Sequence, residues 1–265
     1  MNQTPAAAGP RPQLLHDGWA LTVRAIRVTL RNPVLLMMAT FFPLILLVLI
    51  TVSFGSLVAP GGIRADYVNF SLPLFAVMGI MFAGLGTAMT TYDDLQSGFD
   101  RRLRALPIAR SAPLIGRIAG DAVRNLITLL AVIGVGHLLG FRFTGGLLGA
   151  LGFLILPLVF GTGVAWMMVA IAVHAKSGEA VGSALNAILL VASFLSTGFV
   201  PRQDLPTWIQ PLAAANPVSS VVEAMRGLAA TGPIAAPTWR TLAWTVALIA
   251  VFATIAIRGY RGRER

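Results

Sequence analysis

Long apolar runs separated by short polar segments dominate this sequence of 265 residues. Each run holds about 20 residues, enough for one helix to cross the roughly 30 Å hydrocarbon core of a bilayer. A membrane β-barrel would instead alternate apolar and polar residues in segments of about ten, a pattern that we do not find here. We therefore expect an all-α polytopic membrane protein with six transmembrane helices, near 34–54, 69–91, 119–140, 147–173, 180–200 and 239–257.

The segments outside these runs divide the rest of the chain. Residues 1–13, rich in Pro and Ala, lack the apolar core and cleavage site of a signal peptide, and we expect a disordered cytosolic tail. Residues 14–31 have an apolar face and an Arg-bearing face, which favours an N-terminal interfacial helix, although packing on other helices would also fit. A single transmembrane domain then covers 14–258, and 259–265 form a basic cytosolic tail. Residues 201–238 are too polar for one span but could form two short helices lying at the surface.

The positions of the basic residues predict the orientation in the membrane. The net charge is +10, and fifteen of the 20 basic residues fall on the side that holds both termini. Because Lys and Arg in short loops favour the cytoplasm, both termini should be cytosolic. The Arg, Ala and Gly bias is typical of a bacterial genome rich in G and C, so we expect the bacterial cytoplasmic (inner) membrane. Since most of the charge sits between apolar runs, we expect the lipid bilayer and no nucleic acid as a partner.

Neither a thiolate metal site nor a nucleotide-binding loop is encoded. Cysteine is absent, and we expect no metal site and no cofactor bound by this chain. A phosphate-binding loop needs a Gly-rich turn followed by Lys and then Ser or Thr. The single lysine, Lys176, is followed by Ser177 but has no glycine at the required spacing. Any ATP hydrolysis must therefore come from a separate subunit.

The most polar part of the chain, residues 91–117, lies between the second and third predicted spans. Acidic residues precede a cluster of arginines, and Leu95, Phe99, Leu103 and Leu106 recur at helical spacing. This pattern favours an amphipathic cytosolic hook, ended by a proline, that a soluble motor could grip. A solvated loop whose arginines only fix the topology would also fit.

The segment also resembles a known family. The order of an acidic residue, Gly98, Leu103, Pro107, Arg110, Gly116 and Arg117 is similar to the cytosolic signature of ABC-2 type permeases, and especially of the daunorubicin-resistance-type exporters of actinobacteria. The stretch from Asn216-Pro217-Val218 to Glu223-Ala-Met-Arg226-Gly-Leu228 also matches the family's pattern before the last span. The resemblance extends over nearly the whole chain.

This resemblance implies a membrane-spanning subunit that moves a hydrophobic or amphiphilic substrate, such as an antibiotic, a polyketide or a lipid, out of the cell. By the same resemblance, we expect that the chain is not itself an enzyme, that a nucleotide-binding ATPase subunit holds the ATP and Mg, and that a second permease copy or related permease completes a homo- or heterodimer around the substrate path. The residues that the resemblance assigns to coupling with the ATPase are Asp94, Gly98, Arg101, Leu103, Pro107 and Arg110.

Several polar residues lie within or beside the apolar runs. Asp121 and Arg124, three apart at the start of the third span, are expected to pair on one helix face at the membrane interface. Glu223 and Arg226 are expected to pair and steady a short external helix. Candidates for either the substrate path or helix packing are Asn186, His137, Phe82 and Met78.

Two other classes remain open at this point. An integral-membrane enzyme of phospholipid head-group transfer would use acidic clusters to hold Mg²⁺, here Asp93, Asp94, Asp100 and Asp121, but the Asp-Gly-Ala-Arg pattern of such enzymes is incomplete. An ion-coupled carrier would be expected to have intramembrane carboxylates and an inverted repeat, neither of which is evident. A membrane scaffold without transport activity also fits the apolar pattern.

Overall fold

A computed structural model describes residues 33–58, 64–98 and 112–262, together with Val23 and Arg27. Every regular element within these residues is a helix, so the predicted all-α class is confirmed. Apart from those two helical positions, the predicted tail and interfacial helix at the N-terminus lie outside the described residues. The elements are α2 (Pro33–Val58), α3 (Arg64–Gln96), α5 (Ala112–Leu138), α6 (Gly146–His174), α7 (Gly178–Phe194), η1 (Arg202–Asp204), α8 (Gln210–Ala215), α9 (Pro217–Ala229) and α10 (Ala235–Gly262).

Four helices of the described chain, α3, α5, α6 and α10, are long and apolar enough to cross a membrane. Two further apolar segments are shorter, namely Thr40–Ser53 within α2 and the whole of α7. The 17 residues of α7 extend about 26 Å at 1.5 Å per residue, slightly less than a hydrocarbon core. The chain is thus a polytopic membrane protein with at least four spans of full length.

The prediction that the fifth span reaches residue 200 is wrong, because α7 ends at Phe194. The residues that follow form a polar turn in which side chains bond to the backbone. Ser196 Oγ donates to Ser193 O at 2.6 Å and accepts from Gly198 N at 3.1 Å. Such local bonds compete with helix formation, and α7 ends nearly two turns earlier than hydrophobicity alone suggested.

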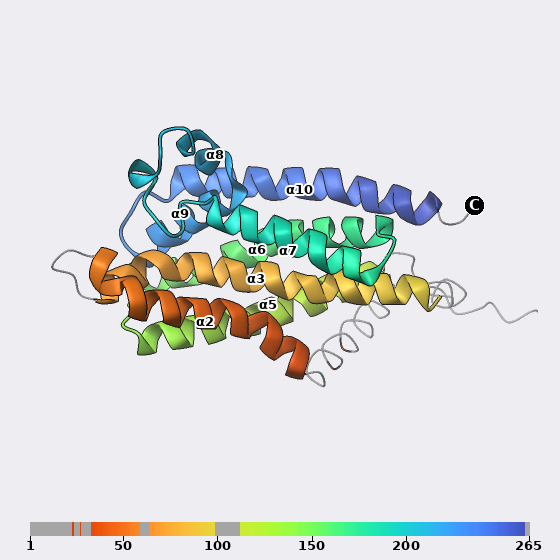
Figure 1. The fold of residues 1–265 in the computed structure, drawn as a ribbon, viewed down its shortest axis with the longest axis horizontal. Coiled ribbons are helices and arrows are strands. Elements are labelled where there is room, and N and C mark those ends of the chain that lie inside the picture. Colours follow the sequence, from red (N-terminus) through yellow and green to blue (C-terminus); the bar gives the residue numbers. More distant parts are fainter. Residues whose placement is uncertain (1–22, 24–26, 28–32, 59–63, 99–111, 263–265) are drawn as a thin grey trace, which may run out of the picture.

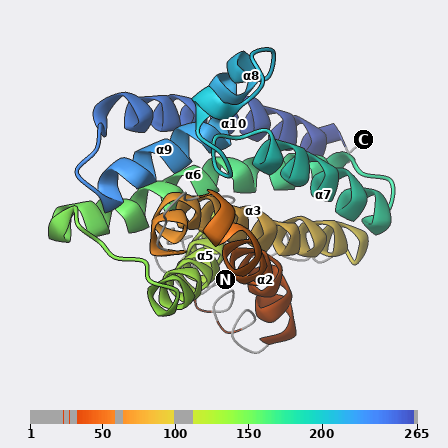
Figure 2. The same ribbon diagram turned by 60° about the vertical axis from the view of Figure 1, so that its left-hand side comes forward.

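The long helices lie side by side, with α3 in the middle (Figures 1 and 2). α3 contacts α2 and α5 on one side and α6 and α7 on the other, while α10 packs mainly on α6 and α9. The most apolar window of α3 is 83% buried, against 11% for that of α10. α3 is therefore the core of the bundle, and most of α10 faces outwards.

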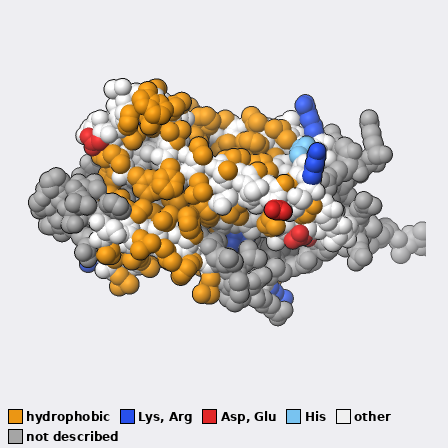
Figure 3. All heavy atoms as spheres, in the orientation of Figure 1, with side chains coloured by type: hydrophobic (Ala, Val, Ile, Leu, Met, Phe, Trp, Pro, Cys, Tyr) orange, Lys and Arg blue, Asp and Glu red, His pale blue; other side chains and the backbone are white. Residues whose placement is uncertain are grey.

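The outward surface is apolar over most of its length, as a bilayer requires. Hydrophobic side chains cover the middle of the face shown in Figure 3, and most of the charged side chains visible there lie towards its right-hand end. On α10, the large side chains of Trp244, Val246 and Val251 are exposed. Exposed apolar residues in such numbers are expected when the solvent is lipid rather than water.

The expectation that residues 201–238 form two helices lying at the surface is wrong for the second helix. α8 is largely exposed, but α9 is inserted among α3, α6 and α10. The backbone of α9 approaches α6 closely, since a Cβ atom on Gly145 or Gly149 would collide with the Leu228 carbonyl. Thr144 N and Gly145 N both donate to Ala229 O, at 2.8 and 3.0 Å. The buried residues of α9 are Val218, Ser219, Ser220, Val221, Val222, Ala224, Met225, Gly227 and Ala229.

Candidate functional site

The predicted cytosolic hook begins where α3 ends. α3 stops at Gln96, Ser97 N donates to Asp93 O at 2.9 Å, and Gly98 takes a positive φ of 67°. A left-handed residue just beyond the last helical turn is a common helix terminator, and glycine adopts it without strain.

This termination corrects one detail of the predicted hook helix. Leu95 belongs to α3, where it packs against a small cluster of α6 and α10 residues, so it does not start a separate helix that runs on to Leu106. Asp94 lies in the last turns of α3 and is half-buried. Four of the six predicted coupling residues lie outside the described residues, namely Arg101, Leu103, Pro107 and Arg110.

Three chain segments meet at this end of the bundle. Tyr92 Oη donates to Lys176 O at 3.4 Å, which places the α6–α7 loop beside the last turns of α3. Gly259 of α10 lies directly against His174, so that a Cβ atom there would collide with the imidazole. Figure 1 shows the C-terminal ends of α3 and α10 and the α6–α7 connection at the same end of the bundle. Lys176 and Arg258 therefore lie on the same side as Gly98.

A buried polar cluster joins α3 to α5 inside the bundle. Arg124 Nη2 lies 2.6 Å from Asp121 Oδ1, so the predicted pair on one helix face is confirmed. Thr87 of α3 completes it: its hydroxyl donates to Asp121 Oδ1 at 2.8 Å and accepts from Arg124 Nη2 at 2.5 Å. The two charged side chains are only 9% and 10% exposed, so the pair is buried between helices rather than open at the interface. We call these residues the Thr87–Asp121–Arg124 cluster.

The cluster leaves some polar atoms without a partner among the described residues. They are Asp121 Oδ2, Arg124 Nε and, one residue further along α5, Asn125 Oδ1. The Asn125 amide lies against Gly161 of α6, where a Cβ atom would approach its Nδ2 to 3.2 Å. Buried groups of this kind carry a desolvation cost, which a purely structural contact between two apolar helices would avoid.

At the opposite end, Arg226 of α9 reaches into the bundle. Its Nε donates to Phe70 O of α3 and its Nη2 to Gly198 O after α7, both at 2.8 Å. The guanidinium carbon also lies 3.5 Å from the centroid of the Phe70 ring, a cation–π distance. Burial lowers the pKa of Arg226 to about 9, and nearby Glu223 raises it in part, so the side chain is still cationic at neutral pH.

Glu223 does not pair with Arg226 as predicted. Its ion pair is with Arg240 of α10, at 3.1 Å, and its Oε1 accepts from Thr197 Oγ1 after α7, also at 3.1 Å. The two side chains diverge because Arg226 is held by backbone carbonyls of α3 and of the turn after α7. Each therefore ties α9 to a different neighbour.

Asn216 fixes the start of α9. Its Oδ1 accepts from Val218 N at 2.9 Å as a helix N-cap, and its Nδ2 donates to Ala192 O and Leu195 O at 2.7 and 3.0 Å. One amide thus satisfies orphan groups at the beginning of α9 and at the end of α7. We refer to Asn216, Glu223 and Arg226 together as the α9 network.

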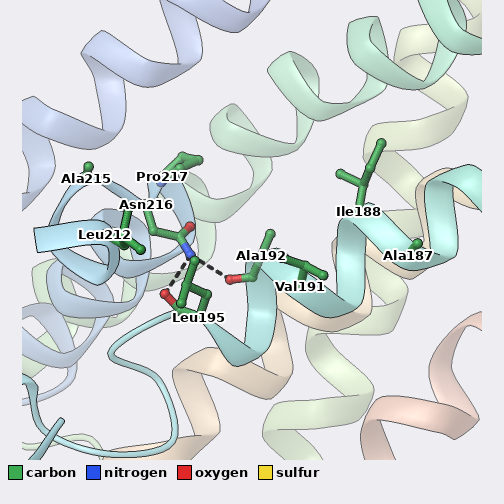
Figure 4. A pocket seen from close by; sticks show the side chains of 9 residues that line it. All are labelled: Ala187, Ile188, Val191, Ala192, Leu195, Leu212, Ala215, Asn216 and Pro217. Atoms are coloured by element: carbon green, nitrogen blue, oxygen red, sulfur yellow. Dashed lines mark hydrogen bonds between the residues drawn. The ribbon is translucent and has the colours of Figure 1, made fainter. Parts of the chain in front are cut away.

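An open apolar groove of about 500 Å³ lies beside Asn216, between α7 and the α8–α9 turn (Figure 4). Figure 4 shows Ile188 and Val191 along α7 and Leu212 opposite, with the Asn216 amide turned towards the end of α7. Such a surface suits an alkyl chain or another apolar helix face. The lining residues are Ala187, Ile188, Val191, Ala192, Leu195, Leu212, Ala215, Asn216 and Pro217.

The four residues proposed for a substrate path or helix packing are not brought together. Met78 is fully buried in the core, and Phe82 is buried with its ring 4.9 Å from that of Phe42. His137 is exposed at the far end of α5, where its Nδ1 lies 2.9 Å from the backbone oxygen four residues earlier, and aromatic rings flank it. Asn186 is exposed on α7 and is not among the residues that line the groove.

The acidic residues do not gather into a metal site in the part of the chain that the structure describes. Asp93 is exposed at the end of α3, whereas Asp121 is buried and paired with Arg124. Asp100 lies outside the described residues. The arrangement thus gives no support to the head-group transferase alternative.

Comparison with known proteins decides the family. The sequence profile described as "ABC-2 type transporter" matches residues 16–229. The chain belongs to the ABC-2 type transporter family. It is 33% identical, over 84% of its length and 80% of the relative, to a probable doxorubicin resistance ABC transporter permease protein DrrC of Mycobacterium tuberculosis (strain ATCC 25618 / H37Rv). It is 32% identical, over 91% of its length and 84% of the relative, to the daunorubicin resistance ABC transporter permease protein DrrB1 of Streptomyces coeruleorubidus.

A more distant relative is the doxorubicin resistance ABC transporter permease protein DrrB of Mycobacterium tuberculosis, 25% identical over 75% of this chain and 72% of that protein. The ABC-2 match covers α2 to α9, and therefore both the Thr87–Asp121–Arg124 cluster and the α9 network. The resemblance seen in the residues between the second and third spans is thus confirmed at the level of the family.

Sequence reasoning missed three polar contacts of this ABC-2 chain, made by Thr87, Asn216 and Glu223. Thr87 carried no signal, because threonine is common in spans and its partners lie 34 and 37 residues further on. Asn216-Pro217 is an N-cap signature followed by proline at the first helical position, and it could have predicted the start of α9. The partner of Glu223, Arg240, lies 17 residues away and had no local marker.

Proposed function

We propose that the chain is the membrane permease subunit of an ATP-driven exporter that moves amphiphilic drugs out of the cell. The observation that carries this proposal is the family match over residues 16–229, together with similarity to permeases named for doxorubicin and daunorubicin resistance. A hydrophobic or amphiphilic substrate suits the apolar helices and the open groove beside Asn216. Lipids share this chemistry and are a second substrate class for the same site.

Six helices span the bacterial cytoplasmic membrane in this proposal: α2, α3, α5, α6, α7 and α10. The apolar segments Thr40–Ser53 of α2 and Gly178–Phe194 of α7 are short, but the whole of α2 runs over 26 residues and α7 is followed directly by the turn at Ser196. Both chain termini and residues 97–111 face the cytosol. The meeting of Gly98, Lys176 and the end of α10 at one end of the bundle supports this topology.

A separate ATPase subunit binds ATP and Mg and contacts the end of α3 and residues 97–111, at Asp94, Gly98, Arg101, Leu103, Pro107 and Arg110. The end of α3 at Gln96 and the left-handed Gly98 support this assignment, because the helix ends just before the stretch of sequence that holds the arginines. Because ABC-2 permeases do not hydrolyse ATP themselves, the energy of ATP hydrolysis reaches the membrane helices through this contact.

The permease works as a pair, with a second copy or a related permease, and the substrate passes between the two. The exposed Asn186 supports pairing through α7, because a polar amide that faces lipid is unfavourable, whereas a facing helix can hydrogen bond to it. Small exposed residues beside it, such as Ser183 and Ala187, would allow close approach of that helix.

Affinity purification of the tagged permease from its native membrane in mild detergent tests the proposal. We expect an ABC-type ATPase to co-purify, and to be lost on Arg110→Glu but retained on Arg142→Glu, a change on the opposite side of the predicted topology. Recovery of a pure permease from active membranes, without any ATPase, would contradict the proposal and favour an ion-coupled carrier or a membrane enzyme.

A further inference from the structure

The Thr87–Asp121–Arg124 cluster lies on the two helices that lead into and out of residues 97–111. We propose that this cluster makes α3 and α5 move as one unit, so that a displacement of residues 97–111 by the ATPase reaches the substrate path. The inference rests on the proposed exporter function. It assigns Thr87, Asp121 and Arg124 as positioning residues for coupling, and none of them touches ATP or substrate.

The position of the cluster fits this role. Thr87 lies nine residues before the end of α3, and Asp121 lies nine residues after the start of α5. At 1.5 Å per residue, both are about 13 Å from the ends of their helices. The cluster therefore joins α3 and α5 at matching distances from their ends. Without it, a force on residues 97–111 could separate the two helices or slide one past the other.

The Thr87 hydroxyl makes the hydrogen bonds that join α3 to α5 in this cluster. Asp121 and Arg124 pair on the same helix, and Thr87 Oγ1 both donates to the carboxylate and accepts from the guanidinium. Because the charged side chains are about nine-tenths buried, these bonds are not screened as surface ion pairs are. Removal of that hydroxyl would separate the α3 side of the cluster from an intact ion pair on α5.

Stability alone does not explain the cluster. Buried ion pairs are often replaceable by apolar residues of similar volume without loss of stability, since desolvation offsets the attraction between the charges. The cluster also leaves Asp121 Oδ2 and Arg124 Nε without partners among the described residues. An interface that only holds α3 against α5 would not need these buried charged groups. A role in fixing the relative position of the two helices during movement accounts for them.

Close packing carries the connection from the cluster towards the other end. A Cβ atom on Gly79 of α3 would lie 2.7 Å from Thr128 Cγ2 of α5, and Gly136 of α5 lies directly against Leu72 of α3. Interdigitated contacts of this kind are stiff. Displacement of the cluster would therefore move α3 and α5 along their whole shared length.

The test compares Thr87→Val with Thr90→Val in the permease co-purified with its ATPase and reconstituted in proteoliposomes. Val keeps the shape of Thr without its hydroxyl. Thr90 is a matched control because it is exposed and its hydroxyl donates only within its own helix, to Gly86 O and Thr87 O. The readout is doxorubicin moved per ATP hydrolysed, which a change in the amount of folded complex does not alter.

We expect Thr87→Val to lower this ratio at least fivefold with ATPase activity within twofold of wild type, and Thr87→Ser and Thr90→Val to keep the wild-type ratio. An unchanged ratio in Thr87→Val would overturn the inference. Failure of the Thr87→Val complex to assemble would overturn it as well, because the hydroxyl would then serve folding. If wild type shows no ATP-driven transport, the proposed function itself fails, which is a different result.

A second measurement follows the helices directly. The chain has no cysteine, so spin labels can be attached to Met89→Cys on α3 and Leu126→Cys on α5, both exposed positions. We expect the distance between these labels to stay unchanged when ATP binds to the wild-type complex, and its distribution to broaden in Thr87→Val. A distance that changes with ATP in the wild-type complex would contradict movement of α3 and α5 as one unit.

Discussion

The two ends of the bundle connect their helices in different ways. At the end that carries Gly98, the described side chains link α3 to α5 by hydrogen bonds of one cluster, in which Thr87 meets the Asp121–Arg124 pair. At the other end, the α9 network spreads its bonds over α3, α10 and the turn after α7. Bonds spread over several helices resist movement of those helices relative to one another. A single link between α3 and α5 instead lets the two helices move together. The comparison indicates that the end with Gly98 relies on one polar link between two helices, whereas the end with α9 is held by bonds to several neighbours.

The largest effect should come from breaking the ion pair of the cluster on one side only. Arg124→Met leaves the Asp121 carboxylate buried without its cation, which typically costs about 3–5 kcal/mol. We expect a clear fall in the thermal unfolding temperature of the purified protein. Asp121→Leu in the same chain should restore most of it. A variant Arg124→Met as stable as wild type would show that the pair is not desolvated in the membrane.

The next largest effect should come from Arg226, the cationic member of the α9 network. Arg226→Met removes the hydrogen-bond donor of the Phe70 and Gly198 carbonyls. A hydrogen bond to a charged group contributes about 1.5–3 kcal/mol to stability. We expect destabilisation of about 2–3 kcal/mol in denaturant-induced unfolding. Arg202→Met, at an exposed arginine of η1, is the control and should be neutral. Equal losses of stability in Arg226→Met and Arg202→Met would contradict a special role of the α9 network in stability.

Asn216 should have an intermediate effect. Asn216→Ala removes an N-cap and two bonds to the end of α7, and loss of a cap alone costs about 0.5–2 kcal/mol. We expect a fall in stability of about 2 kcal/mol, and faster hydrogen exchange confined to the end of α7 and the start of α9. Gln203→Ala, an exposed residue of η1, should leave both unchanged. Exchange that rises uniformly over the whole chain would argue against a local effect of Asn216.

The smallest effect on stability, but a large one on transport, is expected at Gly98. Its φ of 67° costs a non-glycine residue about 1 kcal/mol, and a Cβ atom there meets no atom of the described residues within 4 Å. Gly98→Ala should therefore fold normally, while Gly98→Pro should abolish ATP-driven transport with membrane insertion intact. Gly134→Ala in α5 is the control for both substitutions, because a Cβ atom there also meets no described atom within 4 Å. Full transport by Gly98→Pro would remove this turn from the coupling assignment.

Much of the fold could be predicted from the sequence, because apolar runs of bilayer length are a strong and local signal. The Asp121–Arg124 pair was also predictable, since residues three apart share a helix face. Thr87 was not, because its role depends on how α3 and α5 are placed against each other. The end of α7 was misjudged because hydropathy does not register the backbone bonds of Ser196.

The segment between α7 and α10 shows the same limit. Residues 201–238 are polar and contain several prolines, so a surface location was the natural expectation. Burial of α9 depends on Arg226 and Glu223 finding partners on α3, α10 and the turn after α7, and no sequence pattern reveals partners so far away along the chain.

The central claim, that this ABC-2 chain is an export permease driven by a separate ATPase, is tested most directly by doxorubicin uptake into inside-out membrane vesicles. The vesicles should contain the permease together with its native ATPase partner. We predict uptake that requires hydrolysable ATP, persists when the proton gradient is dissipated, and disappears in Gly98→Pro. Uptake that follows the proton gradient and proceeds without ATP would contradict the account and identify an ion-coupled carrier instead.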